Sequence, residues 1–349
     1  MLCSVNIENF RCFKSVSVNN LKSITVLVGK NGRGKTTFLE ALFLAGGMSP
    51  EILFRTRNWR GGGGELKLNA ETYDSFWRQN FYNFDVSAEA NISFIDSTAR
   101  KRQVRMSYKA NEALELPLAE QKSNASTFSV KAVNFEWTGF SGKKHNCKVE
   151  FKPEGLKLTP FEESYSMVFL NPASLLSPDH NAGRFNELVI ANRESEALVA
   201  VQKLFPEVQG LSMGIDAGSN TILAALRNLK EKLPITSVSA GISKYLAILL
   251  AIYTKKKGAV LVDQIEDGLY FDQMGDIWAS LLEACKANEV QLIVTTHSSE
   301  CLSALLPTLE KNSDDFSLLR SIKDNGECKI RQFSGAQFRD ALSEDAEVR

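Results

Sequence analysis

The sequence predicts an α/β fold in which a nucleotide-binding core is interrupted by an antiparallel, strand-rich region. Residues 1–55 and about 234–305 show buried strands alternating with helices, the pattern of a parallel sheet covered by helices. Residues from about 60 to 165 instead carry short runs of alternating polar and apolar side chains, which is typical of antiparallel strands. A complete phosphate-binding loop at 29–36 places the nucleotide site in the first α/β segment.

The composition indicates a large globular chain with no basic or secreted character. Its 349 residues are 44% hydrophobic, which is enough for a large core or two subdomains. The 41 basic and 41 acidic residues balance, so net charge gives no indication of nucleic-acid binding. The six cysteines are scattered without a CxxC pair, which favours reduced thiols in the cytosol over a disulfide framework or a zinc site.

No segment has the pattern of a signal peptide or of a membrane span. The N-terminus lacks a basic and then apolar stretch, and the longest apolar run, at 245–253, is too short to cross a bilayer. We therefore expect a soluble, cytoplasmic protein with no membrane partner.

The phosphate-binding loop has the form G-x-x-x-x-G-K-[ST]. It follows a β-branched run at 23–28 and precedes an apolar helical segment at 36–45. The glycines let backbone N–H groups turn inward around a polyphosphate, Lys35 supplies a charge for the β- and γ-phosphates, and Thr36 can ligate Mg²⁺. A chance glycine-rich turn is the alternative, but strand, loop and helix in this order favour a nucleotide site.

Two later strands end in residues suited to the same site. The apolar run 258–262 leads into Asp263, and a carboxylate in this position usually completes the Mg²⁺ shell. The run 289–296 leads into His297. A single histidine is more often structural, but we expect this strand to lie parallel to the strand before Asp263. His297 would then reach the γ-phosphate as a neutral hydrogen-bonding switch.

Residues 236–244 place small hydroxyl and glycine residues before the apolar helix at 245–253. Backbone N–H groups at such a helix start can bind an anion. A plain N-cap by Ser239 or Ser243 explains the same residues, and this segment alone favours the N-cap.

The order of these motifs resembles the ABC-type ATPases of the SMC, RecF and OLD (overcoming lysogenization defect) group. The segments that carry the resemblance are GKNGRGKTT, SVSAGISK, VLVDQIEDGLY and IVTTHS, together with the opening strand VNIENFRCFK. IEDGLY is similar to the IENGLH of OLD-like members. The resemblance covers the two ATPase segments, roughly half of the chain, and implies an ABC/SMC-type P-loop core with ATP and Mg²⁺ as cofactors.

The resemblance also implies roles for individual residues. Seven would hold the phosphates and the metal: Asn31, Gly32, Arg33, Gly34, Lys35, Thr36 and Thr37. Asp263 would be the Walker B acid and, with Thr36, a metal ligand. The remaining residues would act at a dimer interface or on the nucleotide: Ser239 and Gly241 as the signature that contacts a partner's γ-phosphate, Asp267 in the D-loop, His297 as the switch, and Arg11 on the nucleotide. Asn171 is a candidate for the Q-loop position.

Four segments describe the expected organisation. They are the N-terminal half of the ATPase core (1–58), the strand-rich insertion (59–170), a helical region (171–233) and the C-terminal half of the core (234–349). Strands are expected at 86–94, 102–108, 128–137 and 147–151, and helices at 194–205 and 221–229.

Gln264 departs from the group's pattern. The residue after the Walker B acid is normally Glu, the base that orients the attacking water, and an amide cannot accept a proton at neutral pH. ATP would bind and a dimer would close, while hydrolysis would be slow or abolished. Either Gln264 was introduced to trap ATP, or the chain naturally lacks this base and Glu266 or His297 compensates. Because the surrounding motifs are intact, we favour the first explanation.

The C-terminal tail differs from that of OLD nucleases, which carry a Toprim domain with clustered carboxylates. The segment after His297 is short, and its acidic residues show no metal-ligand spacing. We therefore expect an OLD-like ATPase without its own nuclease, acting with a separate effector.

Basic and aromatic runs leave direct nucleic-acid binding open. The basic runs lie at 100–102, 143–144 and 255–257, and an aromatic run lies at 76–84. Solvated hairpin ends and core packing are the favoured explanations, and phosphate contact or base stacking are the alternatives.

The leading functional hypothesis is an ATP-hydrolysing, nucleotide-gated homodimeric switch, which can form higher oligomers. Its setting would be bacterial antiphage defence with a separately encoded nuclease or toxin. The alternatives are a RecF-like DNA-binding repair factor, a transporter ATPase subunit, and a scaffold that binds ATP without hydrolysing it.

Overall fold

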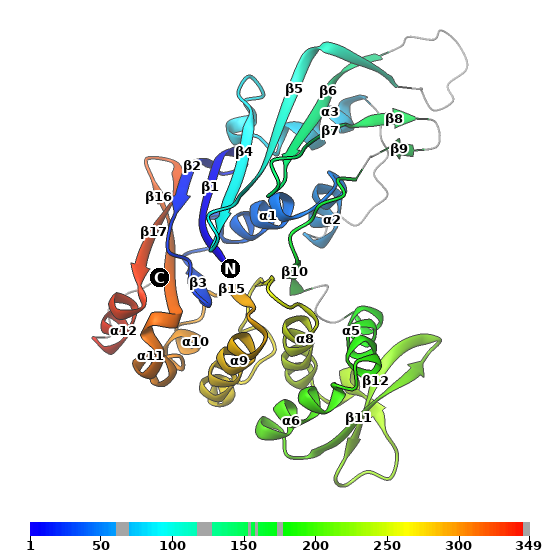
Figure 1. Ribbon diagram of the computed structural model, residues 1–349, viewed down its shortest axis with the longest axis vertical. Helices are drawn as coiled ribbons and strands as arrows, with labels where there is room; N and C mark the ends of the chain where they lie inside the picture. Colours follow the sequence, from blue (N-terminus) through cyan, green and yellow to red (C-terminus); the bar gives the residue numbers. More distant parts are fainter. Residues whose placement is uncertain (61–69, 117–127, 153–154, 158–159, 173–176, 345–349) are drawn as a thin grey trace.

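The computed structural model describes residues 1–60, 70–116, 128–152, 155–157, 160–172 and 177–344. Two six-stranded sheets organise this part of the chain, one at the centre of Figure 1 and one at its top. A smaller three-stranded sheet lies at the bottom of the same view, beside helices α5 (Pro178–Ile190) and α6 (Glu194–Leu204). This arrangement confirms the predicted α/β fold with an antiparallel region.

The central sheet carries the candidate site. Its order is β10 (Met167–Leu170), β14 (Ala259–Val262), β15 (Gln291–Thr295), β3 (Ile24–Val28), β16 (Phe316–Asp324) and β17 (Glu327–Ser334). The first five strands run parallel, and β17 is antiparallel to β16. Every residue of β3, β14 and β15 is buried, as expected for parallel strands covered on both faces.

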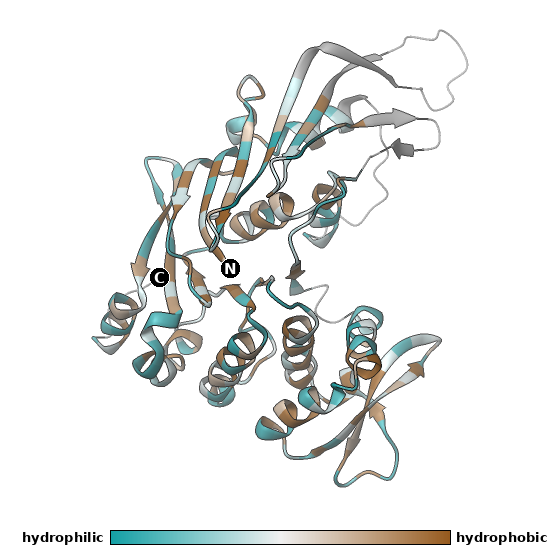
Figure 2. Ribbon diagram, in the orientation of Figure 1, coloured by the Kyte–Doolittle hydropathy of each residue, from teal (hydrophilic) through white to brown (hydrophobic). Residues whose placement is uncertain are grey.

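Helices cover both faces of this sheet. Helix α1 (Lys35–Gly46) lies on one face, where Leu27, Leu261 and Ile293 join its core. Helices α8 (Ala240–Thr254) and α9 (Met274–Asn288) lie on the other face. Helix α8 is buried at every position from Ile242 to Tyr253 and is hydrophobic nearly all round (Figure 2). The apolar helix predicted at 245–253 is therefore confirmed.

Shorter helices complete the described part of the core. They are α7 (Ile235–Val238), α10 (Ser299–Ser303), α11 (Leu306–Asn312) and α12 (Gly335–Ser343). Single 3₁₀ turns lie at η1 (Tyr82–Phe84), η2 (Phe271–Gln273) and η3 (Ser313–Asp315).

The antiparallel sheet begins at the N-terminus of the chain. Its order is β2 (Phe13–Val18), β1 (Leu2–Phe10), β4 (Ala90–Asp96), β5 (Lys101–Leu116), β6 (Phe128–Thr138) and β7 (Lys144–Lys148). A separate pair, β8 (Glu150–Lys152) and β9 (Gly155–Lys157), follows. The strands predicted at 86–94 and 128–137 are confirmed within four residues as β4 and β6, and the one predicted at 102–108 continues to Leu116. The strand predicted at 147–151 is wrong as a single element, because it covers the end of β7 and the start of β8. The predicted boundary at residue 58 divides one sheet, because β1 pairs with β4.

Helix α1 lies between the two large sheets (Figure 1), in contact with β1, β4 and β5 on one side and with β10, β14 and β15 on the other. Helices α2 (Glu51–Trp59) and α3 (Ala70–Arg78) follow it in the chain. The phosphate-binding helix is thus held from both sides.

Two predictions about the segment before α8 are wrong. The helix expected at 221–229 is instead strand β12 (Ser219–Leu226), which pairs with β11 (Val208–Asp216) and with β13 (Leu233–Pro234). Ala217 and Gly218 both have positive φ and form the two-residue turn of a hairpin, whose alternate residues Ile222 and Ala224 enter the core. The region 171–233 is therefore only partly helical.

The assignment of β10 to the strand-rich insertion is the second correction. This strand pairs in parallel with β14 and belongs to the central sheet. Its four residues are too few for a local pattern to show which sheet they join.

One residue of the basic runs and most aromatic side chains of the aromatic run are buried in the fold, whereas other basic residues of these runs lie at the surface. Arg102 is fully buried, and it donates to the backbone oxygens of Ala45 (2.8 Å), Gly47 (2.6 Å) and Glu163 (2.7 Å). In the aromatic run, Phe76, Trp77 and Phe81 are buried in the core. Arg102 therefore joins the phosphate-binding helix to the strand-rich sheet and is unavailable to a nucleic acid.

Candidate functional site

The phosphate-binding loop joins β3 to α1 in a conformation that needs glycine. Gly29 has a φ of 138°, and a Cβ there would lie 2.4 Å from the Ser321 carbonyl oxygen. Gly34 has a φ of 95°, and a Cβ there would lie 2.7 Å from Cys12 Sγ. The Lys35 ammonium group turns back over the loop and donates to Gly29 O at 2.6 Å and to Lys30 O at 3.3 Å. This geometry places the cation above the inward-facing backbone of the loop.

The two predicted metal ligands are adjacent. Thr36 Oγ1 donates to the Asp263 carboxylate, 2.9 Å from Oδ2 and 3.2 Å from Oδ1. Thr295 Oγ1 donates to Asp263 Oδ1 at 2.6 Å and fixes the carboxylate from β15. Asp263 lies at the end of β14 and is 7% exposed. A buried carboxylate needs hydrogen bonds in place of water, and the hydroxyl groups of Thr36 and Thr295 supply them.

This donor set fits Mg²⁺, which P-loop ATPase sites employ. Mg²⁺ is typically bound by one or two carboxylates, with the remaining positions filled by phosphate oxygens and water. Thr36 and Asp263 supply one hydroxyl and one carboxylate. Within the described ranges no cluster of three or more His, Cys, Asp or Glu residues could form an all-protein cage. These two residues would hold the ion, which would supply charge neutralisation for the phosphates.

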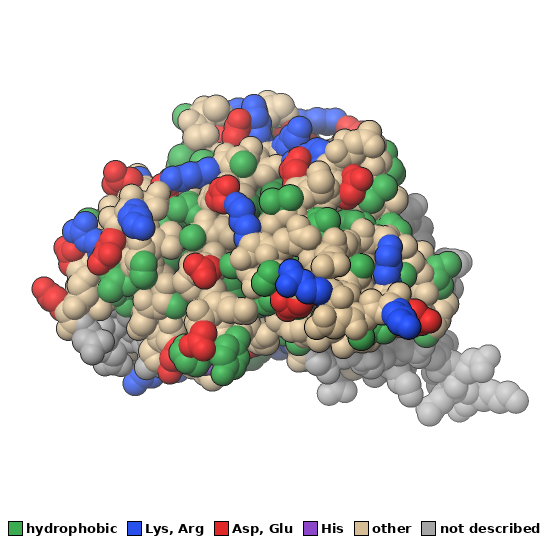
Figure 3. All heavy atoms as spheres, turned by 90° about the horizontal axis from the view of Figure 1, so that it is seen from below, with side chains coloured by type: hydrophobic (Ala, Val, Ile, Leu, Met, Phe, Trp, Pro, Cys, Tyr) green, Lys and Arg blue, Asp and Glu red, His purple; other side chains and the backbone are tan. Residues whose placement is uncertain are grey.

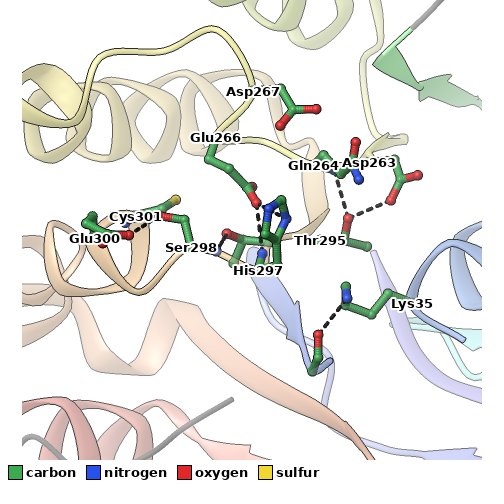
Figure 4. A network of polar contacts seen from close by, with 12 residues as sticks. Lys35, Asp263, Gln264, Glu266, Asp267, Thr295, His297, Ser298, Glu300 and Cys301 are labelled. Carbon is green, nitrogen blue, oxygen red and sulfur yellow. Dashed lines mark hydrogen bonds and ion pairs between the residues drawn. The ribbon is translucent and has the colours of Figure 1, made fainter. Parts of the chain in front are cut away.

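The strand order explains why these residues meet. Strand β15 pairs in parallel with β14 on one side and with β3 on the other. The carboxyl ends of all three strands therefore lie at one edge of the sheet. Asp263 follows β14, the phosphate loop follows β3, and His297 follows β15, the strand that lies between the other two. Figure 4 shows Thr295, at the end of β15, beside Asp263. The predicted parallel pairing of the Asp263 and His297 strands is confirmed.

Gln264 is held by its backbone. It has a φ of 55°, its N–H donates to Thr295 Oγ1 at 2.8 Å, and its carbonyl oxygen accepts from Lys244 Nζ at 2.7 Å. Figure 4 shows its side chain beside Asp263. The position that the resemblance assigns to the base therefore carries an amide, which cannot take a proton.

Glu266 holds His297 at two points. Glu266 Oε1 accepts from the backbone N–H of His297 at 2.8 Å and lies 2.6 Å from Nδ1 of its ring. Glu266 is 13% exposed, whereas His297 is 49% exposed. The ring therefore projects from the sheet edge while its Nδ1 side is fixed by a carboxylate.

The segment predicted to be the signature packs against the loop that contains Asp267, the predicted D-loop residue. Ser239 caps α8, with Oγ accepting from Ile242 N at 3.4 Å, so the plain N-cap expected from the sequence is present. A Cβ on Gly241 would lie 2.9 Å from Gly268 O, so the helix start and the loop are in direct backbone contact. Asp267 lies in this loop and is exposed.

Lys244 is a site residue that sequence reasoning did not single out. It is 3% exposed, and its Nζ donates to the backbone oxygens of Gln264 (2.7 Å) and Asp267 (2.6 Å). Burial lowers the pKa of Lys244 to about 8, although the nearby carboxylates of Asp267 and Glu266 oppose the shift. The available signal was a single lysine in an otherwise apolar helix.

The contacts of Arg11 and Thr37 involve other groups than the Asp263 carboxylate. Arg11 pairs with the buried carboxylate of Glu40, which also pairs with Arg60, and Arg11 Nε donates to Asn80 Oδ1 at 3.1 Å. A nucleotide contact by Arg11 stays a prediction. Thr37 accepts from Arg60 Nη2 at 3.4 Å.

The loop residues Asn31, Gly32 and Arg33 lie in the turn before α1, where Arg33 O accepts from Ser321 Oγ. Asn171 follows β10 and is buried. The residue before it, Leu170, lies beside the end of β14, since Leu170 O accepts from Asp263 N at 2.9 Å. The Q-loop role of Asn171 stays a prediction.

Two family models match the chain. A model described as "AAA ATPase domain" matches residues 1–172, and one described as "AAA domain, putative AbiEii toxin, Type IV TA system" matches residues 177–303. Both describe AAA-type ATPase domains, so the chain is an ATPase of this general type. Neither distinguishes the OLD group, and that finer assignment stays a prediction.

Two proteins with sequence similarity were found. An "ATP/GTP phosphatase" of Helicobacter pylori is 23% identical over 333 residues, covering 87% of each chain. The "Uncharacterized protein MJECL10" of Methanocaldococcus jannaschii is 32% identical over 123 residues. That match covers 33% of this chain and 53% of the relative, so the chain spans about half the length of this second protein.

Solved structures with a similar backbone include two SMC head domains. The SMC head domain from Thermotoga maritima is 13% identical with a TM-score of 0.46, over 95% of this chain and 99% of that one. The Smc head domain with an extended coiled coil, bound to a ScpA domain derived from Pyrococcus furiosus, is 13% identical with a TM-score of 0.49, over 99% of each chain. In the part of the chain described here, no helix has the length and hydrophobicity to span a membrane.

Replacing Gln264 by Glu is expected to raise ATP turnover by tenfold or more. A carboxylate in this place can accept a proton from the attacking water, and the amide cannot. Steady-state phosphate release with saturating Mg²⁺-ATP measures the effect. Gln264→Ala, which removes the amide without adding a base, should stay at the level of the unmodified chain. Equal turnover in the Glu and Gln proteins would refute this expectation.

Replacing Lys244 by Met is expected to change how stability depends on pH. Because the folded-state pKa of Lys244 is about 8 instead of the usual 10.5, the cost of burying the ammonium is full below pH 8 and falls as the pH rises toward 10.5. The free energy of unfolding of the unmodified chain should therefore rise relative to Lys244→Met between pH 7 and 10, by about 2–3 kcal/mol.

Denaturant unfolding of the two proteins at several pH values measures this difference. Lys257→Met is the control, because the Lys257 side chain is 78% exposed. A difference between the unmodified chain and Lys244→Met that stays constant from pH 7 to 10 would contradict the assignment.

Proposed function

We propose that the chain is an ATP-gated homodimeric switch in which Ser239 of one protomer meets the nucleotide on its partner. The observation that carries this proposal is the direct packing of the signature helix on the D-loop, through Gly241 and Lys244. The helix start and the loop are in direct contact, and we propose that together they form the surface that faces the partner. In a closed dimer this surface would contact the partner's ATP, and release of the nucleotide would open the dimer.

An exposed aromatic pair supports a partner on this surface. Tyr270 and Phe271 directly follow the D-loop, are 66% and 60% exposed, and have ring centroids 5.5 Å apart. Neighbouring exposed aromatic side chains are typical of protein interfaces, where they supply apolar contact area. Their position next to Asp267 favours an interface that includes the D-loop.

We place the switch in bacterial antiphage defence, where it controls a separate nuclease or toxin. The family description that names an AbiEii toxin of a type IV toxin–antitoxin system supports this setting, as does the resemblance of the motifs to OLD-like ATPases. The antiparallel sheet is the surface that we assign to effector or trigger recognition, and higher oligomers of the dimer are compatible with it.

A DNA-binding repair factor is less favoured, because several basic residues considered as alternative phosphate contacts are paired with acids. Arg100 pairs with Asp96, and both Arg105 and Lys144 pair with Glu136. On the face seen in Figure 3, Lys and Arg side chains are interspersed with Asp and Glu. Such a surface lacks the concentrated positive charge that phosphate contact requires.

Mg²⁺-ATP is expected to convert the chain from monomer to dimer, and Ser239→Arg is expected to block this conversion while ATP still binds. The arginine would occupy the space of the partner's γ-phosphate, whereas the phosphate loop of the same subunit is unchanged. Sedimentation velocity with and without Mg²⁺-ATP measures the mass, and a fluorescent ATP analogue measures binding.

Ser334→Arg is the matched control, because Ser334 caps α12 in the same way that Ser239 caps α8. It should dimerise normally, which separates loss of an N-cap from loss of the signature contact. Dimerisation by Ser239→Arg equal to that of the control would exclude the proposed interface.

The defence setting is tested by purifying the tagged chain from its native host with and without Mg²⁺-ATP, followed by mass spectrometry. A stoichiometric nuclease or toxin whose association depends on ATP is the expected result. Recovery of the chain with DNA alone would instead favour the repair-type function.

A further inference from the structure

We propose that Glu266 and His297 form a carboxylate–imidazole pair that activates the attacking water in this chain, in place of the carboxylate missing at position 264. The proposal rests on the ATP binding described under Proposed function and assigns the residues that perform hydrolysis there. His297 would be the catalytic residue, and Glu266 would be the positioning residue that acts through it.

The geometry of the pair is that of an oriented imidazole. Glu266 Oε1 lies 2.6 Å from His297 Nδ1 and also accepts from the His297 backbone N–H at 2.8 Å. Holding both the ring and the backbone fixes the direction of the side chain. When Nδ1 donates its proton to the carboxylate, the lone pair of the neutral ring lies on Nε2, which is the arrangement of a general base.

The location of the pair fits a role at the γ-phosphate. His297 emerges between the strand of the phosphate loop and the strand of Asp263. The negative charges of Asp263 and Glu266 both act on Lys35, where they oppose the lowering of its pKa by burial. Glu266 therefore belongs electrostatically to the phosphate site even though it points at His297 (Figure 4).

Glu266 would also stabilise the positive charge that forms on the imidazole during the proposed step. Its second oxygen, Oε2, is buried and has no hydrogen-bond partner within the described part of the chain. An incompletely compensated buried carboxylate is stabilised when a positive charge forms beside it. Protonation of His297 would create that charge 2.6 Å from Oε1.

The reaction that we assign is attack of water on the γ-phosphorus of ATP. A bond forms between the water oxygen and phosphorus, and the bond from phosphorus to the bridging oxygen of ADP breaks. The water proton passes to His297 Nε2, and Glu266 stabilises the resulting imidazolium. The proton then leaves to the released phosphate or to solvent, so that ADP and inorganic phosphate are the products and the neutral imidazole is restored.

The test compares phosphate release by the full-length chain and by Glu266→Gln, His297→Gln and the double variant. Each single substitution is expected to lower kcat by about 100-fold, with KM for ATP changed less than threefold, as for loss of a general base. The double variant should be no slower than His297→Gln, because Glu266 acts only through His297. A merely structural Glu266 would not give this non-additivity.

Two controls sharpen the comparison. Glu300→Gln alters a nearby carboxylate, which accepts from Ser298 Oγ at 2.8 Å, and it should leave kcat unchanged. In the Gln264→Glu background, Glu266→Gln should cost less than threefold, because the restored carboxylate takes over the proton. If Glu266→Gln fails to fold, His297→Gln in the two backgrounds gives the same comparison.

Three results would overturn the pair. They are an unchanged kcat in Glu266→Gln, multiplicative losses in the double variant, and an equal loss with Gln or Glu at position 264. If the unmodified chain binds ATP and dimerises but shows no turnover, the catalytic role of Glu266 and His297 is refuted, whereas the proposed ATP-gated dimer is not. Absence of ATP binding would refute the switch itself.

Discussion

The side-by-side pairing of β14, β15 and β3 is the constraint on which the candidate site depends. Val262 is aligned with Val294, and Thr295 with Leu27. The carboxyl ends of the three strands therefore lie side by side at one edge of the sheet. Thr295 then reaches both the Asp263 carboxylate and the Gln264 N–H. A slip of two residues would displace one strand end by about 6.6 Å, more than twice the length of a hydrogen bond. It would separate Asp263 from the phosphate loop.

A second constraint is the packing of the phosphate-binding helix α1 against both large sheets. Helix α1 is enclosed by both large sheets, and its Glu40, which is 2% exposed, receives the guanidinium groups of Arg11 and Arg60. A buried carboxylate of this kind is tolerated because it is paired and hydrogen-bonded. Because Arg11 lies directly after β1, this pairing and the Arg102 contacts tie the antiparallel sheet to the helix that carries Lys35 and Thr36. The antiparallel sheet is thus part of the support of the nucleotide site.

Elements could be predicted from the sequence where a short run of consecutive residues determines the structure. The phosphate loop, the apolar strands and helix α8 each show their structure in consecutive residues, and the strands of the antiparallel sheet alternate as expected. The errors arose where a distant pairing decides the outcome. Strand β12 was mistaken for a helix because its apolar residues suit both periods, and only the turn at Ala217 and Gly218 selects the hairpin. The connection of β1 to β4, the place of β10, and the contacts of Lys244 and Glu266 likewise depend on residues far apart in the chain.

The ammonium group of Lys244 would couple the two nucleotide sites of the proposed dimer. It belongs to the helix that starts at Ser239, yet it is bonded to the carbonyl groups of Gln264 and Asp267, which flank Glu266. A displacement of the helix start by a partner's phosphate would therefore be transmitted through one side chain to the loop beside the subunit's own nucleotide. In the proposed dimer, two sites linked in this way in each direction would not fill or empty independently. The dimer would respond to ATP as a single cooperative unit, with a threshold in nucleotide concentration sharper than that of either site alone.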